Sequence, residues 1–165
     1  MQTTRHIAVY PGSFDPFTIG HREVAERAAR IFGEVIVAVA RDAEKQHLFT
    51  TDERMAMAAD ACQGLGNVRV DSFEGLVVEY AAGQGAQALL KGLRAISDFE
   101  REMQMDAMNR ELAPALDTVY LMATPASTFL SSSLVKHVFS LGGDISRFVT
   151  PLALAKLEAK LRKPA

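Results

Sequence analysis

The chain has one cysteine, no tryptophan and no long apolar run among its 165 residues. Because Cys62 has no second cysteine to pair with, an internal disulfide is excluded, and we expect a reducing, cytoplasmic environment. The longest apolar run, Val35-Ile36-Val37-Ala38-Val39-Ala40, is far shorter than a membrane span. The N-terminus lacks the apolar segment of a secretory signal, so we expect no association with membranes.

The chain also lacks an excess of charge of either sign, since its formal net charge is −2. This balance gives no general attraction to nucleic acid or to anionic membranes, so any phosphate must be bound by locally placed cations. No pair among the four histidines has zinc-ligand spacing with Cys62, which argues against a structural zinc site. What the chain does have is 48% hydrophobic residues, enough for one domain over residues 1–165 with a sizeable core.

Segments with strand character alternate with segments of helical periodicity. Strands are predicted at residues 7–10, 35–40, 68–70, 88–90 and 118–122, and the first two are apolar on both faces, as buried parallel strands are. Helices are predicted at residues 21–32, 76–84, 98–112 and 132–141, with two more starting at a capping box from Thr50 to Glu53 and at Thr150-Pro151. This alternation indicates a doubly wound, Rossmann-like α/β domain with about five parallel strands and a C-terminal helix.

Two loops rich in glycine and charge follow predicted strands. One covers residues 11–21 after the first strand, and the other is Lys91-Gly92-Leu93-Arg94 after the fourth. We expect the strand order 3-2-1-4-5, which makes the first and fourth strands neighbours where the winding reverses. Such folds bind ligands at that point, outside the carboxyl ends of the strands, so both loops would border one crevice.

The first loop contains Gly12-Ser13-Phe14-Asp15-Pro16 and leads to Gly20-His21, where a helix is predicted to begin. Gly, Ser, Asp and Pro are common turn formers, so a plain turn is one interpretation. The start of a helix, however, presents free N–H groups and a positive dipole end to an anion. Histidine is an unusual cap, and in this crevice we favour a functional His21 beside a nucleotide phosphate.

Two further clusters support the hypothesis of a phosphate site. Lys91 and Arg94 flank Gly92, and Arg offers phosphate a planar fork whereas Lys offers a point charge; a surface salt bridge is the alternative. Ser131-Ser132-Ser133 precede an apolar helix that carries Lys136 in its first turns. Capping needs only one serine, so we favour phosphate binding at these hydroxyls over simple capping.

The predicted helix at residues 98–112 has more apolar surface than one core face requires. Core packing is the first interpretation of these side chains, and a subunit interface is the second. The residues concerned are Phe99, Met103, Met105, Met108 and Leu112.

The loop from Gly12 to His21 resembles the signature of the nucleotidyltransferase superfamily. Two segments are more specific: Lys91-Gly92-Leu93-Arg94 followed by Asp98-Phe99-Glu100, Glu102, Gln104 and Met108-Asn109, and Phe49-Thr50 followed by Glu53-Arg54. With them, nearly the whole chain resembles the phosphopantetheine adenylyltransferase family. The resemblance implies transfer of an adenylyl group from ATP to 4′-phosphopantetheine, which gives dephospho-coenzyme A and pyrophosphate in the penultimate step of coenzyme A synthesis.

The resemblance also implies roles for individual residues. His21 would stabilise the transition state at the α-phosphate, while Ser13 and Lys45 would hold the attacking phosphate. Lys91 would be shared by the two substrates, and the pantetheine arm would run along Leu76 and Val77. The ATP site would comprise Ser13, Phe14, His21, Gly92, Leu93, Arg94, Glu102, Ser127, Thr128, Phe129, Leu130, Ser131, Ser132 and Ser133.

The resemblance further implies partners for the chain. Mg²⁺ would accompany the triphosphate of ATP, with no metal site on the protein itself. Coenzyme A is a further expected ligand, and the family's assembly is a homohexamer.

Two positions depart from the family pattern, and two alternatives stay open. Lys91 replaces a common Arg, which removes bidentate contact with phosphate, and Ser127 stands where some relatives carry an aromatic residue near the adenine. A sister transferase with another phosphorylated acceptor, such as nicotinate mononucleotide, would keep the first loop, but residues 91–109 argue against it. A non-catalytic sensor of adenine nucleotides or coenzyme A is less compatible with intact Ser13, His21 and Lys45.

Overall fold

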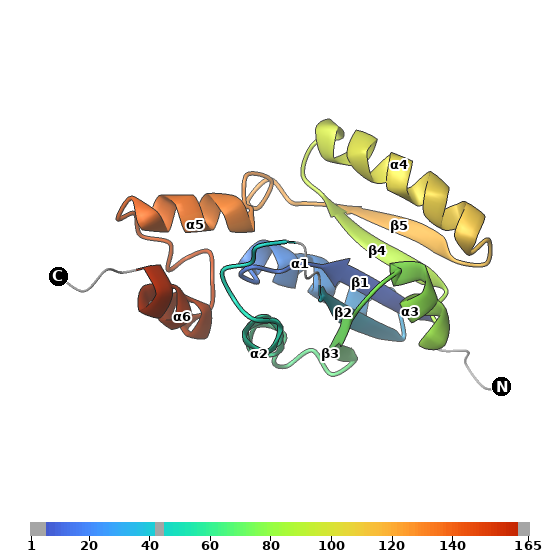
Figure 1. The fold of residues 1–165 in the computed structure, drawn as a ribbon, viewed down its shortest axis with the longest axis horizontal. Coiled ribbons are helices and arrows are strands. Elements are labelled where there is room, and N and C mark those ends of the chain that lie inside the picture. The colour runs from blue at the N-terminus through green and yellow to red at the C-terminus, as the bar shows by residue number, and fades with distance from the viewer. Residues whose placement is uncertain (1–5, 42–44, 162–165) are drawn as a thin grey trace.

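A computed structural model describes residues 6–41 and 45–161, with a parallel sheet of five strands at its centre (Figure 1). The strand order is β3-β2-β1-β4-β5, which confirms the predicted order and places β1 beside β4 where the winding reverses. The strands are β1 (Ile7–Gly12), β2 (Glu34–Ala40), β3 (Val68–Phe73), β4 (Ala88–Leu93) and β5 (Asp117–Met122).

Strand β1 pairs over a longer stretch with β2 than with β4. β1 pairs with β2 along its whole length, from Ile7 opposite Glu34 to Gly12 opposite Val39. Its pairing with β4 is limited to Ala8 opposite Ala88 and Val9 opposite Leu89. The sheet therefore separates between β1 and β4 toward their carboxyl ends.

Helices follow each strand, as the alternation predicts. Figure 1 shows α5 and α6 side by side beyond one end of the sheet, and α4 along β4 and β5. The helices are α1 (Ile19–Ala29), α2 (Thr51–Ala61), α3 (Val77–Gly83), α4 (Ile96–Leu112), α5 (Ser132–Ser140) and α6 (Pro151–Leu161). Among the described residues, none of the helices is long and apolar enough to cross a membrane.

The fourth strand is longer than its sequence predicts, and this corrects the interpretation of Lys91-Gly92-Leu93 as a loop. These residues continue β4, because each pairs with β5: Lys91 with Tyr120, Gly92 with Leu121 and Leu93 with Met122. Ladder pairing outweighs the low strand propensity of glycine here. A Cβ at Gly92 would come within 3.1 Å of Val24 Cγ2, so the glycine lets α1 lie close against β4.

Both faces of the sheet are buried, as the apolar first two strands predict. On one face, Val35, Val37 and Val39 of β2 pack with α1 and α2. On the other face, Val9, Ile36 and Leu89 pack with α3. Cys62 is buried in the first of these clusters, as a small apolar residue would be, and burial raises the pKa of its thiol to about 11.

Helix α4 is the exception to this burial, since Asn109 is its one buried residue. Its methionines do not enter the core, so the interpretation of their side chains as core packing is wrong. Ile96 is 79% exposed, and the others are about half exposed: Met103, Met105, Met108 and Leu112. An unusually large apolar surface is therefore left uncovered along α4.

Candidate active site

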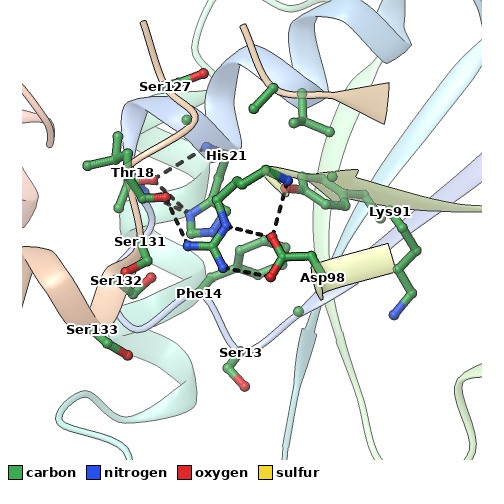
Figure 2. Close-up of a pocket in the computed structure, with 18 of the residues that line it drawn as sticks. Ser13, Phe14, Thr18, His21, Lys91, Asp98, Ser127, Ser131, Ser132 and Ser133 are labelled. Carbon is green, nitrogen blue, oxygen red and sulfur yellow. Dashed lines mark hydrogen bonds and ion pairs between the residues drawn. The ribbon is translucent and has the colours of Figure 1, made fainter. Parts of the chain in front are cut away.

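A cavity of about 360 Å³ lies where β1 and β4 separate, a volume that suits a small-molecule ligand (Figure 2). The two predicted loops do converge on it, together with the residues before α5. Twelve of the predicted site residues line it: Ser13, Phe14, His21, Lys91, Gly92, Arg94, Glu102, Ser127, Leu130, Ser131, Ser132 and Ser133.

Six predicted site residues do not line this cavity. Leu93 is buried on the face of β4 opposite Gly92, because side chains alternate along a strand. Thr128 and Phe129 are exposed, on the segment between β5 and α5. Lys45 lies on the loop before α2, and Leu76 and Val77 lie at the start of α3. Any role for these residues needs a ligand that extends beyond the cavity.

His21 is part of the cap of α1. The helix begins two residues before the predicted start, because Thr18 is the N-cap and His21 is the third helical residue. The His21 N–H donates to Thr18 Oγ1 at 3.4 Å, and the Thr18 N–H donates to His21 Nδ1 at 3.0 Å. This is a reciprocal capping box in which histidine takes the place of the usual Glu or Gln.

The cap fixes which ring nitrogen of His21 carries the proton. A backbone N–H can only donate, so Nδ1 must be the unprotonated acceptor and the neutral ring must carry its proton on Nε2. The ring packs against Phe14 and Phe17, with centroid distances of 5.1 and 5.3 Å. Burial, with a smaller effect of the Arg94 charge, lowers the pKa of His21 to about 4. At neutral pH, His21 is therefore an uncharged donor through Nε2.

The loop before this cap is folded over β1 in an unusual conformation. Phe14 has a φ of 51°, in the left-handed region that a bulky residue rarely adopts. Its ring lies against Tyr10, with a centroid distance of 5.2 Å. A Cβ at Gly12 would lie 2.7 Å from Phe14 Cζ, so only glycine leaves room for this ring.

Both cations at the end of β4 are held by carboxylates of α4. Lys91 Nζ lies 2.9 Å from Glu102 Oε2, and Arg94 Nε lies 3.2 Å from Asp98 Oδ2. Both cations are therefore salt-bridged and both line the cavity, and phosphate binding at them stays a prediction. Figure 2 shows the ammonium end of Lys91 turned away from His21 and Asp98. The cavity thus presents cations at two separate places, each already oriented by a partner.

The three serines at the start of α5 make different contacts, which corrects the expectation that all three hydroxyls face an anion. Ser131 is the N-cap of α5, and its Oγ accepts from the Leu134 N–H at 3.1 Å. Ser132 Oγ donates to the Pro16 carbonyl at 2.8 Å, which ties α5 to the first loop. Lys136 does not line the cavity and instead pairs with Asp15 at 2.6 Å. What remains for an anion is the start of the helix, the exposed Ser133, and the O–H of Ser131, whose oxygen accepts in the cap while its proton stays free to donate.

Glu23 of α1 was not anticipated as a site residue, yet it holds one wall of the cavity. Its carboxylate accepts from Ser127 Oγ at 2.5 Å and from Thr124 Oγ1 at 3.0 Å. Burial raises the pKa of Glu23, but the hydrogen bonds from Ser127, Thr124 and Arg27 outweigh it and the net pKa is lowered. Ser127 therefore lines the cavity with its hydroxyl already bound to Glu23.

Asp15 is a second residue whose role the sequence did not show. It is 5% exposed, and it accepts from the Leu48 and Phe49 N–H groups at 3.0 and 2.9 Å and from Lys136. Burial by itself raises the pKa of Asp15. The hydrogen bonds from Lys136, Leu48 and Phe49 outweigh this effect, so the net pKa is lowered and the carboxylate is charged at neutral pH. This one side chain therefore joins the first loop, the segment before α2, and α5.

Comparison with known proteins identifies the family. The cytidylyltransferase-like protein family matches residues 9–138. Phosphopantetheine adenylyltransferase of Herpetosiphon aurantiacus is 54% identical over 154 residues, which are 93% of each chain. The enzyme of the same name from Heliobacterium modesticaldum is 52% identical, over 93% of this chain and 92% of its own. The chain belongs to the phosphopantetheine adenylyltransferase family. The resemblance that residues 91–109 indicated is thereby confirmed.

Solved structures of nucleotidyltransferases share the fold of this phosphopantetheine adenylyltransferase family member. Plasmodium falciparum nicotinic acid mononucleotide adenylyltransferase complexed with NaAD aligns with a TM-score of 0.69, over 94% of this chain and 95% of its own, at 17% identity. A putative nicotinate-nucleotide adenylyltransferase from Vibrio parahaemolyticus aligns with a TM-score of 0.68, over 94% and 93%, at 18% identity. These similarities show the fold alone, and they confirm the Rossmann-like architecture.

The lowered pKa of His21 predicts how the stability of this family member depends on pH. The folded value is about 4 and the ordinary value is 6.5, so the unfolded chain takes up the proton first as the pH falls. The free energy of unfolding should therefore be highest above the ordinary value and fall by up to roughly 3 kcal/mol on acidification through this window. Urea denaturation at several pH values measures this fall, and His21→Asn should remove that part of it. An identical pH dependence in the variant would contradict the assignment.

Proposed function

We propose that this chain transfers the adenylyl group of ATP to 4′-phosphopantetheine, with release of pyrophosphate and dephospho-coenzyme A. The observation that carries the proposal is one cavity lined by a neutral His21 donor, by the cations Lys91 and Arg94, and by the start of α5. Such an arrangement suits two phosphorylated substrates that meet at one phosphorus atom. The family to which the chain belongs supports the choice of acceptor.

The reaction needs no covalent intermediate with the protein. A phosphate oxygen of the acceptor attacks the α-phosphorus of ATP, and the bond from that phosphorus to the oxygen shared with the β-phosphorus breaks. The electron pair of that bond leaves with pyrophosphate. Positioning and charge stabilisation supply the catalysis.

Each substrate phosphate has a proposed place. The His21 Nε2–H lies ready to donate to a non-bridging oxygen of the α-phosphate, where negative charge increases in the transition state. Arg94, Ser133 and the start of α5 would hold the β- and γ-phosphates. Ser13, Lys91 and the nearby Lys45 loop would hold the acceptor phosphate, and the pantetheine arm would continue toward Leu76 and Val77.

Mg²⁺ is proposed as part of the MgATP substrate. No cluster of three or more His, Cys, Asp or Glu side chains is placed to hold a metal in residues 6–41 and 45–161. The groups that line the cavity are mainly cations, hydroxyls and N–H donors, which suit a magnesium ion held by phosphate oxygens and water.

The proposed function can be tested by comparing pyrophosphate release with different acceptor substrates. Pyrophosphate release from MgATP should be rapid with 4′-phosphopantetheine and much slower with unphosphorylated pantetheine, because Lys91 and its neighbours hold an anion. Nicotinate mononucleotide serves as the control for a sister transferase. Equal rates with pantetheine, or release with the mononucleotide alone, would overturn the proposal. Binding of both substrates without release would indicate a sensor.

We also propose that the chain works in the cytoplasm as a homohexamer and that coenzyme A, which contains the product's pantetheine arm and nucleotide, binds the same site. The apolar face of α4 supports assembly, because its methionines are about half exposed in the single chain and contact with another chain would remove this apolar surface from water. Light scattering should give six times the mass of one chain at micromolar concentration. Met105→Glu with Met108→Glu should lower that mass, and a wild-type monomer would contradict the assembly.

A further inference from the structure

Arg54 of α2 is a buried arginine that does not line the cavity but bonds to Ser13, which does. Arg54 is 2% exposed, and it is the largest of the fully buried residues in the described part of the chain. Its Nη1 donates to the carbonyl oxygens of Ser13 at 2.6 Å and Ala40 at 3.0 Å, and its Nη2 donates to Thr51 Oγ1 at 3.1 Å. The guanidinium therefore joins the carboxyl ends of β1 and β2.

This charge is poorly compensated by its surroundings. In the parts of the chain that the structure describes, no carboxylate forms an ion pair with Arg54, and its Nε has no hydrogen-bond partner. The negative charge that it feels most is Asp15, whose oxygens are already bound by Leu48, Phe49 and Lys136. A buried cation with so little compensation lowers stability compared with an apolar side chain of similar size. Its presence calls for a role other than packing.

The bond to Ser13 fixes the direction of one peptide. The peptide between Ser13 and Phe14 is trans, so its C=O and N–H groups point in opposite directions. Arg54 holds the Ser13 C=O on the side of α2, so the Phe14 N–H points away from α2, and both Ser13 and Phe14 line the cavity. A charged donor on the carbonyl also polarises the peptide, which makes its N–H a stronger donor.

The same bond helps to maintain the left-handed conformation of Phe14. A φ of 51° is unfavourable for phenylalanine unless its neighbours enforce it. The Phe14 ring is fixed from one side by Tyr10 and His21, and the preceding carbonyl is fixed from the other side by Arg54.

We propose that Arg54 is a positioning residue for adenylyl transfer: it turns the Phe14 N–H toward the reacting phosphates and places a fixed positive charge behind that peptide. This inference rests on the proposed position of the phosphates beside Ser13 and Phe14. Arg54 itself touches no substrate.

The test compares Arg54→Met, which keeps the length but removes the charge and the donors, with Arg54→Lys, which keeps the charge and one bond. Arg54→Met should lower kcat/KM by roughly 10²-fold, as loss of an aligned transition-state donor does. The dissociation constant for ATP should rise while that for adenosine, which has no phosphates, stays unchanged. Arg54→Lys should lie between Arg54→Met and the wild type in both measurements.

The matched control is Arg22→Met. Arg22 also donates to a main-chain carbonyl, that of Ala61 in α2 at 2.8 Å, but its bonds go to Ala61 and Glu26 and not to the Ser13 carbonyl. This variant should lower the melting temperature and leave the ratio of ATP to adenosine affinity at the wild-type value. If Arg54→Met does not fold, the same ratio in Arg54→Lys decides the question.

A wild-type ratio and a wild-type kcat in a folded Arg54 variant would overturn the role of Arg54. That outcome, with normal turnover of 4′-phosphopantetheine by the wild type, would leave the proposed function intact. Failure of the wild-type chain to turn over this acceptor would contradict the function instead.

Discussion

Replacing His21 with alanine should lower kcat by about 10²–10³-fold while ATP affinity changes much less. The Nε2–H is proposed to donate where negative charge increases during the attack, so its loss should affect the transition state more than the bound substrate. Arg94, Ser133 and the start of α5 remain to hold ATP. Steady-state kinetics and ATP binding on one preparation measure the two effects separately.

The capping box adds a consequence for stability, because His21 Nδ1 accepts from the Thr18 N–H. His21→Ala should therefore also lower the free energy of unfolding, by about 1 kcal/mol. Two variants separate the two roles of the ring. The Asn side chain places an acceptor near the position of Nδ1, so His21→Asn should keep stability and lose turnover. The Gln side chain places a donor near Nε2, so His21→Gln should keep more turnover. Near-normal kcat in His21→Asn would show that the ring is a cap alone.

Replacing Lys91 with methionine should lower kcat/KM for 4′-phosphopantetheine by about 10²-fold. The change removes a cation from the proposed acceptor site, and it leaves the Glu102 carboxylate, 2.9 Å from Lys91 in the wild type, unpaired near a dianion. Truncation of one member of such a pair typically costs about 2–5 kcal/mol, and partial exposure of both side chains places this case at the lower end. Initial rates at varied acceptor concentration give the value.

Two companion variants separate the parts of this effect. Lys91→Met with Glu102→Gln should recover about tenfold, because the unpaired carboxylate is gone. Arg110→Met is the control, because it also removes one positive charge but does so outside the cavity. Arg110 lies on α4 and pairs with the exposed Asp117. A loss in Lys91→Met no larger than in Arg110→Met would mean that Lys91 does not bind the acceptor.

The fold could be predicted from the sequence because its signals are local. The capping box from Thr50 to Glu53 is present in both directions, and the apolar runs of β1 and β2 are buried on both faces as expected. The carboxyl end of β4 could not be predicted, because ladder pairing with β5 extends the strand through a glycine that alone suggests a turn.

The sequence predicted most of the residues that line the candidate site, but it did not predict which partners their side chains bond to. The Thr18 and His21 box has the spacing of a capping box, but histidine is not the residue that the pattern calls for. The partners of Asp15 lie 33 and 121 residues away in the sequence, so no local pattern could indicate them. Ser132 likewise bonds to Pro16, 116 residues distant, and this contact removes its hydroxyl from the proposed anion site.

The short ladder between β1 and β4 divides the candidate active site between two halves of the sheet. His21 and Ser13 follow β1, whereas Lys91 and Arg94 belong to β4 and the turn after it. Beyond Val9 and Leu89 no further rung fixes the separation of these strands. A ligand with phosphates on both sides would supply cross-links that the backbone omits, and its binding energy would add to the cohesion of the whole chain. The sheet thus has the fewest hydrogen bonds between neighbouring strands where the two substrates are proposed to meet.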